Sequence, residues 1–176
     1  HQARCYQLAR DGRHVVLVTP TASGKTLAYN LPILQRFIEE PDATALYLFP
    51  TKALSQDQQH ELNGVVLESD LPLSVATYDG DPPQAVRAKL RQEGRAIITN
   101  PDMLHAGVLP NHPKWARFFR SLRFVVIDEL HTYRGIFGSH LTNVLRRLKR
   151  VAAFYGASPQ FICCSATIAN PKEHAE

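Results

Sequence analysis

The sequence has few cysteines and no long apolar run, and each shortage excludes a class of protein. Its three cysteines, Cys5 alone and Cys163 beside Cys164, form neither a disulfide framework nor the spaced pairs of a zinc site. We therefore expect a reducing, cytoplasmic location. No apolar run approaches the roughly 20 residues that span a bilayer, so we expect no membrane partner.

The two ends of the sequence also lack features of a complete, secreted chain. The first residues, 1–14, are polar and basic, without an initiator Met and without the apolar core of a signal peptide. The last residues, 169–176, are polar as well. We expect the sequence to be a segment of a longer protein.

The bulk composition is that of one globular domain. The chain has 176 residues, of which 44% are hydrophobic and 20% are charged, and this is enough to bury a substantial core. The formal net charge of +4 indicates a nucleic-acid partner only weakly.

Six short apolar runs, rich in residues that favour strands, recur along the chain. They occupy 14–18, 45–49, 73–78, 96–99, 124–128 and 160–164. The longer stretches between most of them have helical spacing; in 141–152, for example, apolar residues recur every three or four positions. Strands that alternate with helices predict an α/β fold, with a mostly parallel central sheet and helices on both faces.

A polar cluster follows each apolar run directly. Because the carboxyl ends of parallel strands meet at one edge of the sheet, these clusters are expected to form one functional edge. The clusters lie at 19–26, 50–54, 79–81, 99–102, 128–131 and 165–167.

The first cluster, TPTASGKT at 19–26, ends as phosphate-binding loops do. Gly24 would allow the backbone to approach phosphates, Lys25 would reach the terminal phosphates, and Thr26 would bind Mg²⁺. Thr19 stands where the usual loop pattern has glycine. The alternative is a turn that caps a helix.

The fifth cluster places Asp128 and Glu129 at the end of an apolar strand. In P-loop ATPases the first such carboxylate holds Mg²⁺ and the second polarises the attacking water. An acid pair at a strand end is by itself a common solvated turn. Together with the loop at 19–26, it predicts nucleotide hydrolysis.

The ordered motifs TASGKT, PTKAL, TNPD, DELH and SAT resemble the first RecA-like domain of superfamily 2 helicases of the DExH type. The residues in and around these motifs look most like those of the mitomycin-repair-factor type of DNA-repair helicases, relatives of the Lhr-like enzymes. The resemblance implies a RecA-like P-loop fold and an ATP-dependent, 3′-to-5′ DNA helicase that uses ATP and Mg²⁺. It also implies a second RecA-like domain, which this sequence does not contain.

The resemblance assigns roles around the nucleotide. It assigns adenine recognition to Gln2, and it makes the loop residues Thr21, Ala22 and Ser23 part of the cofactor site together with Gly24, Lys25 and Thr26. A terminal glutamine that is simply solvated remains the alternative for Gln2.

The resemblance also predicts residues that couple hydrolysis to strand separation. His131 corresponds to the histidine that links the hydrolytic site to the partner domain, and it joins Lys25, Asp128 and Glu129 as a catalytic candidate. Ser165 and Thr167 belong to the SAT motif, which couples ATP turnover to unwinding. A capping or surface histidine is the alternative for His131.

Three of the clusters are expected to contact single-stranded or forked DNA through its phosphates. Their residues are Pro50, Thr51, Lys52, Asp79, Gly80, Thr99, Asn100, Pro101 and Asp102. Helix caps and tight turns are the alternative, and a capped helix end also binds phosphate. The basic stretches 114–123 and 146–150 are either further attraction for nucleic acid or solvated faces.

Two other functions remain open from the sequence alone. One is an RNA helicase of the same superfamily, because these motifs contact the backbone and do not report the sugar. The other is a nucleotide-switched binding module that does not unwind.

Overall fold

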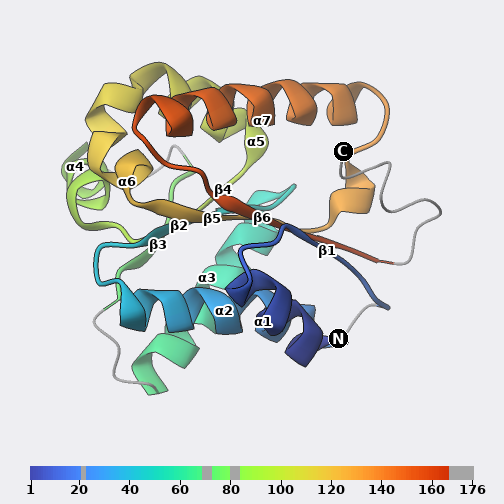
Figure 1. Ribbon diagram of the computed structural model, residues 1–176. Coiled ribbons are helices and arrows are strands. Elements are labelled where there is room, and N and C mark those ends of the chain that lie inside the picture. Colours follow the sequence, from blue (N-terminus) through green and yellow to red (C-terminus); the bar gives the residue numbers. More distant parts are fainter. Residues whose placement is uncertain (21–22, 69–72, 80–83, 167–176) are drawn as a thin grey trace.

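A six-stranded, wholly parallel sheet forms the centre of the molecule (Figure 1). The computed structural model describes residues 1–20, 23–68, 73–79 and 84–166. The strand order is β1-β6-β5-β2-β4-β3, which confirms the predicted α/β fold with a parallel sheet. The strands are β1 (Val15–Val18), β2 (Thr44–Leu48), β3 (Val75–Thr77), β4 (Ala96–Thr99), β5 (Leu122–Ile127) and β6 (Gln160–Ser165).

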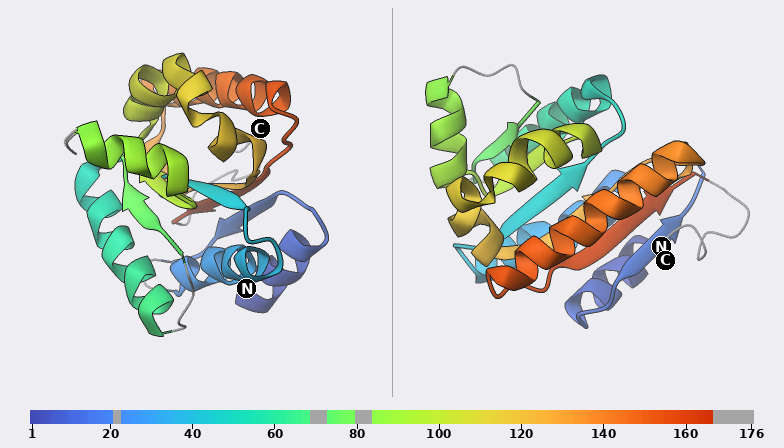
Figure 2. Two further views of the ribbon diagram at one scale, coloured as in Figure 1. Left: turned by 90° about the vertical axis from the view of Figure 1, so that its left-hand side faces the viewer. Right: turned by 90° about the horizontal axis from the view of Figure 1, so that it is seen from above.

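Helices cover both faces of the sheet, as Figures 1 and 2 show. One face carries α1 (Gln2–Arg10), α2 (Lys25–Glu39) and α3 (Lys52–Glu68). The other carries α4 (Gln84–Glu93), α6 (Ala116–Arg120) and α7 (Ile136–Phe154). Four short helical segments complete the described chain: α5 (Pro101–Met103), the π-helix η1 (Leu104–Val108), and the 3-10 helices η2 (Leu109–Trp115) and η3 (Leu130–Thr132). No described helix combines the length and apolar character needed to cross a membrane.

Alternate residues of the central strands belong to two separate hydrophobic cores. In β2, Ala45 and Tyr47 pack in the core beneath α1, α2 and α3. Leu46 and Leu48 point the other way, into the core beneath α6 and α7. Because both faces of the sheet are buried, apolar residues do not alternate with polar ones along the strand, and the strand appears in the sequence as a continuous apolar run.

The fifth strand begins earlier than the apolar pattern predicts. Residues 124–128 are the apolar run, yet β5 starts at Leu122, which pairs with Thr44 of β2. Arg123 interrupts the pattern. Its guanidinium is satisfied at the start of the strand, where Nε donates to Glu40 Oε2 at 2.8 Å.

Arg95 joins three elements that are distant in the sequence. Its Nη2 donates to the carbonyls of Phe37 (2.9 Å) and Glu40 (3.0 Å), and its Nε donates to that of Ala43 (3.2 Å). The guanidinium also lies 4.7 Å from the centre of the Phe37 ring. These carbonyls belong to the end of α2 and the turn into β2, so one side chain ties both to the start of β4.

We predict that Arg95→Met lowers the free energy of unfolding by about 2 kcal/mol, because hydrogen bonds from a charged donor contribute about 1.5–3 kcal/mol. Chemical denaturation of the chain measures this change. Arg91→Met, on the neighbouring α4, is the matched control and is expected to change stability little. Equal stability of the two variants would contradict the role given to Arg95.

Candidate nucleotide site and nucleic-acid edge

The loop after β1 is closed at its base by Thr19, the residue that replaces the usual glycine. The N–H of Thr19 donates to the Ser165 carbonyl at 3.3 Å, which extends the pairing of β1 with β6. Its hydroxyl accepts a hydrogen bond from Ser23 Oγ at 2.6 Å across the loop. The side chain at this position therefore fixes the loop entrance. Thr21 and Ala22 lie outside the described residues.

Gly24 occupies the junction between the loop and α2 in a left-handed conformation, with φ +76°. The left-handed backbone favours glycine, and a Cβ atom here would lie only 2.5 Å from Gln2 Nε2 and displace that side chain from the loop. Gln2 Nε2 donates to the Gly24 carbonyl at 3.3 Å. The structure thus brings Gln2, at the start of α1, against the loop.

Lys25 begins α2, and its side chain is buried, with 8% exposed. Its ammonium lies 3.9 Å from Glu129 Oε1, and among the described residues it has no hydrogen-bond partner. Glu129 offsets the charge of this ammonium, but buried N–H donors without an acceptor are costly, and phosphate oxygens could accept from them. Together with the N-terminus of α2 and half-buried Thr26 in its first turn, this ammonium fits a phosphate group.

Asp128 follows β5 directly and is buried, with 6% exposed. The hydroxyl of Tyr29 hydrogen-bonds its Oδ2 at 3.1 Å, and the same hydroxyl lies 2.9 Å from Gln58 Oε1 on α3. Burial is the main cause that raises the pKa of the Asp128 carboxyl above its ordinary value, and the charge of Glu129 adds to it. A divalent cation beside Asp128 would favour the ionised form, so the site fits a metal ion.

Glu129 adopts φ +52°, the only positive φ of a non-glycine residue among the described positions. Its N–H donates to Asp128 Oδ1 at 2.8 Å, which holds this conformation in place. The strain places the Glu129 carboxylate between Lys25, at 3.9 Å, and His131 Nε2, at 3.3 Å.

His131 connects this carboxylate to the end of β6. Its Nδ1 accepts a hydrogen bond from the Ala166 N–H at 3.2 Å and lies 3.3 Å from Ser165 Oγ. An accepting Nδ1 leaves the ring proton on Nε2, the atom that faces Glu129. The structure therefore joins the DELH and SAT motifs through one imidazole. Thr167 lies outside the described residues.

The second cluster at this edge of the sheet begins α3. Thr51 Oγ1 accepts from the Leu54 N–H at 3.3 Å and thereby caps the helix, next to half-buried Pro50. Lys52 Nζ lies 3.6 Å from Asp79 Oδ2, so these two predicted contact residues are paired with each other. Gly80 lies outside the described residues.

The third cluster is divided between the surface and the interior. Asn100 caps α5, since its side chain accepts from the Met103 N–H at 2.8 Å, and Asp102 is exposed. Thr99 is fully buried, and its hydroxyl donates to the Tyr78 carbonyl at 2.6 Å. Pro101 is buried as well. A strand that contacts this cluster can therefore reach Asn100 and Asp102, while Thr99 and Pro101 shape the turn beneath them.

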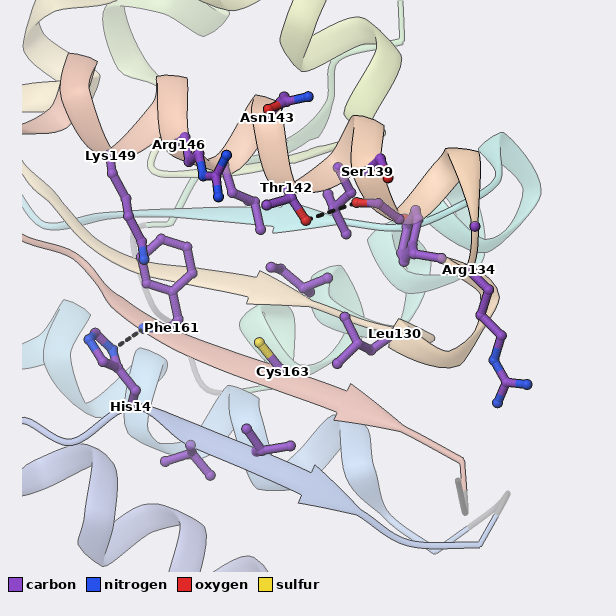
Figure 3. A pocket seen from close by; sticks show the side chains of 18 residues that line it. His14, Leu130, Arg134, Ser139, Thr142, Asn143, Arg146, Lys149, Phe161 and Cys163 are labelled. Carbon is purple, nitrogen blue, oxygen red and sulfur yellow. Dashed lines mark hydrogen bonds between the residues drawn. The ribbon is translucent and has the colours of Figure 1, made fainter. Parts of the chain in front are cut away.

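A cavity of about 660 Å³ lies between α7 and the β1–β6 edge of the sheet (Figure 3). Lys149, Phe161 and His14 line one end of it, and Arg134 lines the other. Neither Lys25 nor Asp128 lines it, so this cavity is not the candidate nucleotide site.

A loop between a strand and a helix, with an acid pair at the end of the next strand but one in the same parallel sheet, defines a P-loop nucleotide-binding domain. The chain belongs to the DEAD/DEAH box helicase family, whose model matches residues 1–174. This finding confirms the resemblance to superfamily 2 helicases drawn from the motifs.

Individual relatives agree with this family. The ATP-dependent helicase YprA of Bacillus subtilis is 57% identical over 176 residues, which are 100% of this chain and 24% of that protein. The ATP-dependent helicase HRQ1 of Saccharomyces cerevisiae is 45% identical, over 99% of this chain and 16% of that protein. The chain therefore spans a quarter or less of the length of these relatives.

A solved structure agrees equally well. The crystal structure of the DUF1998 helicase MrfA bound to DNA and AMPPNP matches with a TM-score of 0.98 and 57% identity. The match covers 100% of this chain and 25% of that chain.

Sequence reasoning missed Tyr29, whose hydroxyl contacts Asp128, and Gln58, whose Oε1 is a second acceptor beside the same hydroxyl. Burial raises the pKa of the Tyr29 hydroxyl well above its ordinary value, so the hydroxyl keeps its proton and can donate it to the carboxylate. Tyr29 lies three positions beyond Thr26 on α2, which was the available signal. Gln58 becomes recognisable only once α3 is packed beside α2.

We predict that Tyr29→Phe weakens Mg²⁺-dependent nucleotide binding, because Asp128 loses the hydroxyl that orients it. Tyr47→Phe is the matched control. Tyr47 is also buried, lies edge-to-face with Tyr29, and donates to Asn30 Oδ1 instead. Each variant is expected to lose about 1 kcal/mol of stability. Nucleotide titration with Mg²⁺ measures the difference, and the same affinity in both variants would contradict the role of Tyr29.

Proposed function

We propose that this chain is the ATP-binding lobe of an ATP-dependent DNA helicase that works with 3′-to-5′ polarity in DNA repair. The observation that carries the proposal is the buried Lys25 ammonium, which faces Glu129 and has no hydrogen-bond partner among the described residues. Membership of the DEAD/DEAH box helicase family supports it. So do the helicase names of the relatives and the DNA and AMPPNP bound in the MrfA structure.

The residues of the site divide the work of binding and hydrolysis. Bound ATP supplies the phosphoanhydride whose cleavage drives the motor, and Mg²⁺ neutralises charge on its phosphates. Lys25 and the N-terminus of α2 would hold the phosphates, while Thr26 and Asp128 would hold Mg²⁺. Glu129 accepts a proton from the attacking water and orients it.

Gln2 and the loop residues Thr21, Ala22, Ser23 and Gly24 complete the proposed nucleotide site. Gln2 would recognise the adenine. Its hydrogen bond from Nε2 to the Gly24 carbonyl supports this role, because it places the glutamine in direct contact with the phosphate-binding loop. Ser165 and Thr167 belong to the proposed coupling path. The contact of His131 Nδ1 with Ser165 Oγ supports the coupling of hydrolysis to the end of β6.

The nucleic acid lies along the carboxyl edge of the sheet in this proposal. Asn100, Asp102 and the N-terminus of α3 would contact phosphates, and Lys52 would exchange its Asp79 partner for the backbone. Gly80 completes the edge between these clusters. Contacts to the backbone suit a motor that must move along any sequence.

A second RecA-like domain is part of the proposed enzyme. Among the described residues, no arginine forms a hydrogen bond or ion pair with Asp128 or Glu129. Arginine fingers contribute about 10³–10⁵ in rate in P-loop enzymes, so hydrolysis requires arginines from the second domain. We place the enzyme in the cytoplasm, where its free cysteines would remain reduced.

We predict that Lys25→Ala weakens nucleotide binding about 10- to 100-fold, because a charge-assisted contact contributes about 1.5–3 kcal/mol. Lys52→Ala is the matched control. It is expected to leave nucleotide affinity unchanged and to weaken binding of single-stranded DNA instead. Titrations of both variants with a labelled ATP analogue and a labelled oligonucleotide measure the two effects. Unchanged nucleotide affinity in Lys25→Ala would refute the proposed site.

A further inference from the structure

Helix α7 carries a strong positive charge without compensation from its own acidic residues. Residues 136–154 contain no aspartate or glutamate, yet four cations lie close together: Arg146, Arg147, Lys149 and Arg150. The opposite side of the helix is buried, with Leu141, Val144, Leu148 and Ala152 in the core. The buried side of the helix contains none of these cations.

These cations line a shallow groove on the outer surface of the upper helical layer. The groove has a volume of about 580 Å³, and no carboxylate lines it among the described residues. We call it the α7 groove; its lining residues are His105, His140, Asn143, Val144, Arg146, Arg147, Lys149 and Arg150. Figure 2, in the view from above, shows α7 in orange, running diagonally on the side that faces the viewer.

Arg146 and Lys149 also line the cavity between α7 and the sheet, whereas Arg147 and Arg150 line the α7 groove and not that cavity. Arg147 Nη1 lies 3.5 Å from the His105 carbonyl, and Lys149 Nζ lies 5.0 Å from the centre of the Phe161 ring. Among the described residues, none of the four cations forms an ion pair with a carboxylate. Arg146 and Arg150, four positions apart on one helix, repel each other, and a bound polyanion would relieve this repulsion.

The α7 groove is continuous with the proposed nucleic-acid edge. Asp102, which follows β4 at that edge, lies 3.2 Å from His140 Nε2 on α7 without the geometry of a hydrogen bond. The rings of His140 and His105 meet edge to face, with 5.4 Å between their centres. His105 in turn contacts Arg147 through its carbonyl. A nucleic acid that leaves the carboxyl edge at Asp102 can therefore continue along α7.

We propose that the α7 groove binds the phosphate backbone of duplex DNA next to the single strand held at the carboxyl edge. The inference rests on the proposed function. The cations extend from Arg146 to Arg150, four positions or about 6 Å along the helix axis, which exceeds the roughly 3.4 Å axial rise per phosphate of one DNA strand, so the positive track is long enough for more than one phosphate. Duplex DNA carries one negative charge per about 1.7 Å of its axis, which is twice the density of one strand.

The chemistry of the lining favours a duplex over a single strand. Single-strand sites combine cations with aromatic platforms on which bases stack. No Phe, Tyr or Trp lines the α7 groove among the described residues. Val144 is its one apolar lining residue, so the described groove offers little to an apolar protein segment. A surface of cations whose described lining contains no Phe, Tyr or Trp matches a backbone whose bases are paired.

The test measures binding of two probes to the full-length protein that contains this domain. One probe is a duplex with a single-stranded 3′ tail, and the other is the tail alone. We expect Arg147→Gln with Arg150→Gln to weaken binding of the tailed duplex about tenfold at 0.1 M salt. The salt slope should fall by about 1.8, or about 0.9 for each lost phosphate contact. Binding of the tail alone should stay unchanged.

Arg4→Gln with Arg13→Gln is the matched control. It removes the same charge from exposed positions at α1 and in the turn that follows it, on the opposite side of the sheet. Thermal unfolding of both double variants verifies that they fold. The proposal would be overturned if the two double variants lost duplex binding equally. It would also be overturned if the α7 variant lost none, and that result would favour another occupant of the groove, such as an acidic protein. Failure of the parent to bind the tail would instead contradict the proposed function.

Discussion

The ammonium of Lys25 is the constraint on which the rest of the site depends. It is buried where α2 begins, 3.9 Å from Glu129, with no hydrogen-bond partner among the described residues. A buried cation in this state makes the site ready for an anion. Glu129 holds its strained conformation beside it because its own N–H donates to Asp128. The strained turn thus places the carboxylates of Asp128 and Glu129 close to the phosphate-binding loop after β1.

The parallel sheet explains why distant motifs act together. All of its strands run in one direction, so the loop after β1, the acid pair after β5 and the end of β6 share one edge. His131 then links two of these ends, since it contacts Glu129 with one ring nitrogen and the Ala166 N–H with the other. Movement of the turn after β5 would therefore be transmitted through this imidazole to the end of β6, and movement there would be transmitted back.

Sequence alone predicts the fold class and the chemical centre, because both depend on local patterns. Strand runs, the Gly-Lys-Thr loop and the acid pair are all contiguous in the chain. Sequence could not reveal that Tyr29 bridges Asp128 and Gln58, since that contact depends on how α2 packs against α3 and β5. Nor could it show that Thr99 is fully buried. A threonine at the end of a strand looks the same in the sequence whether its hydroxyl meets solvent or a neighbouring carbonyl.

Dependence of nucleotide affinity on Mg²⁺ tests the central claim most directly, namely that Lys25 and Asp128 are two halves of one site. A non-hydrolysable ATP analogue is titrated into the parent chain and into Asp128→Asn, with and without Mg²⁺. The parent is predicted to bind at least about tenfold more tightly with Mg²⁺, and Asp128→Asn is predicted to lose most of that gain while it retains binding through Lys25. The same gain from Mg²⁺ in both proteins would contradict the account.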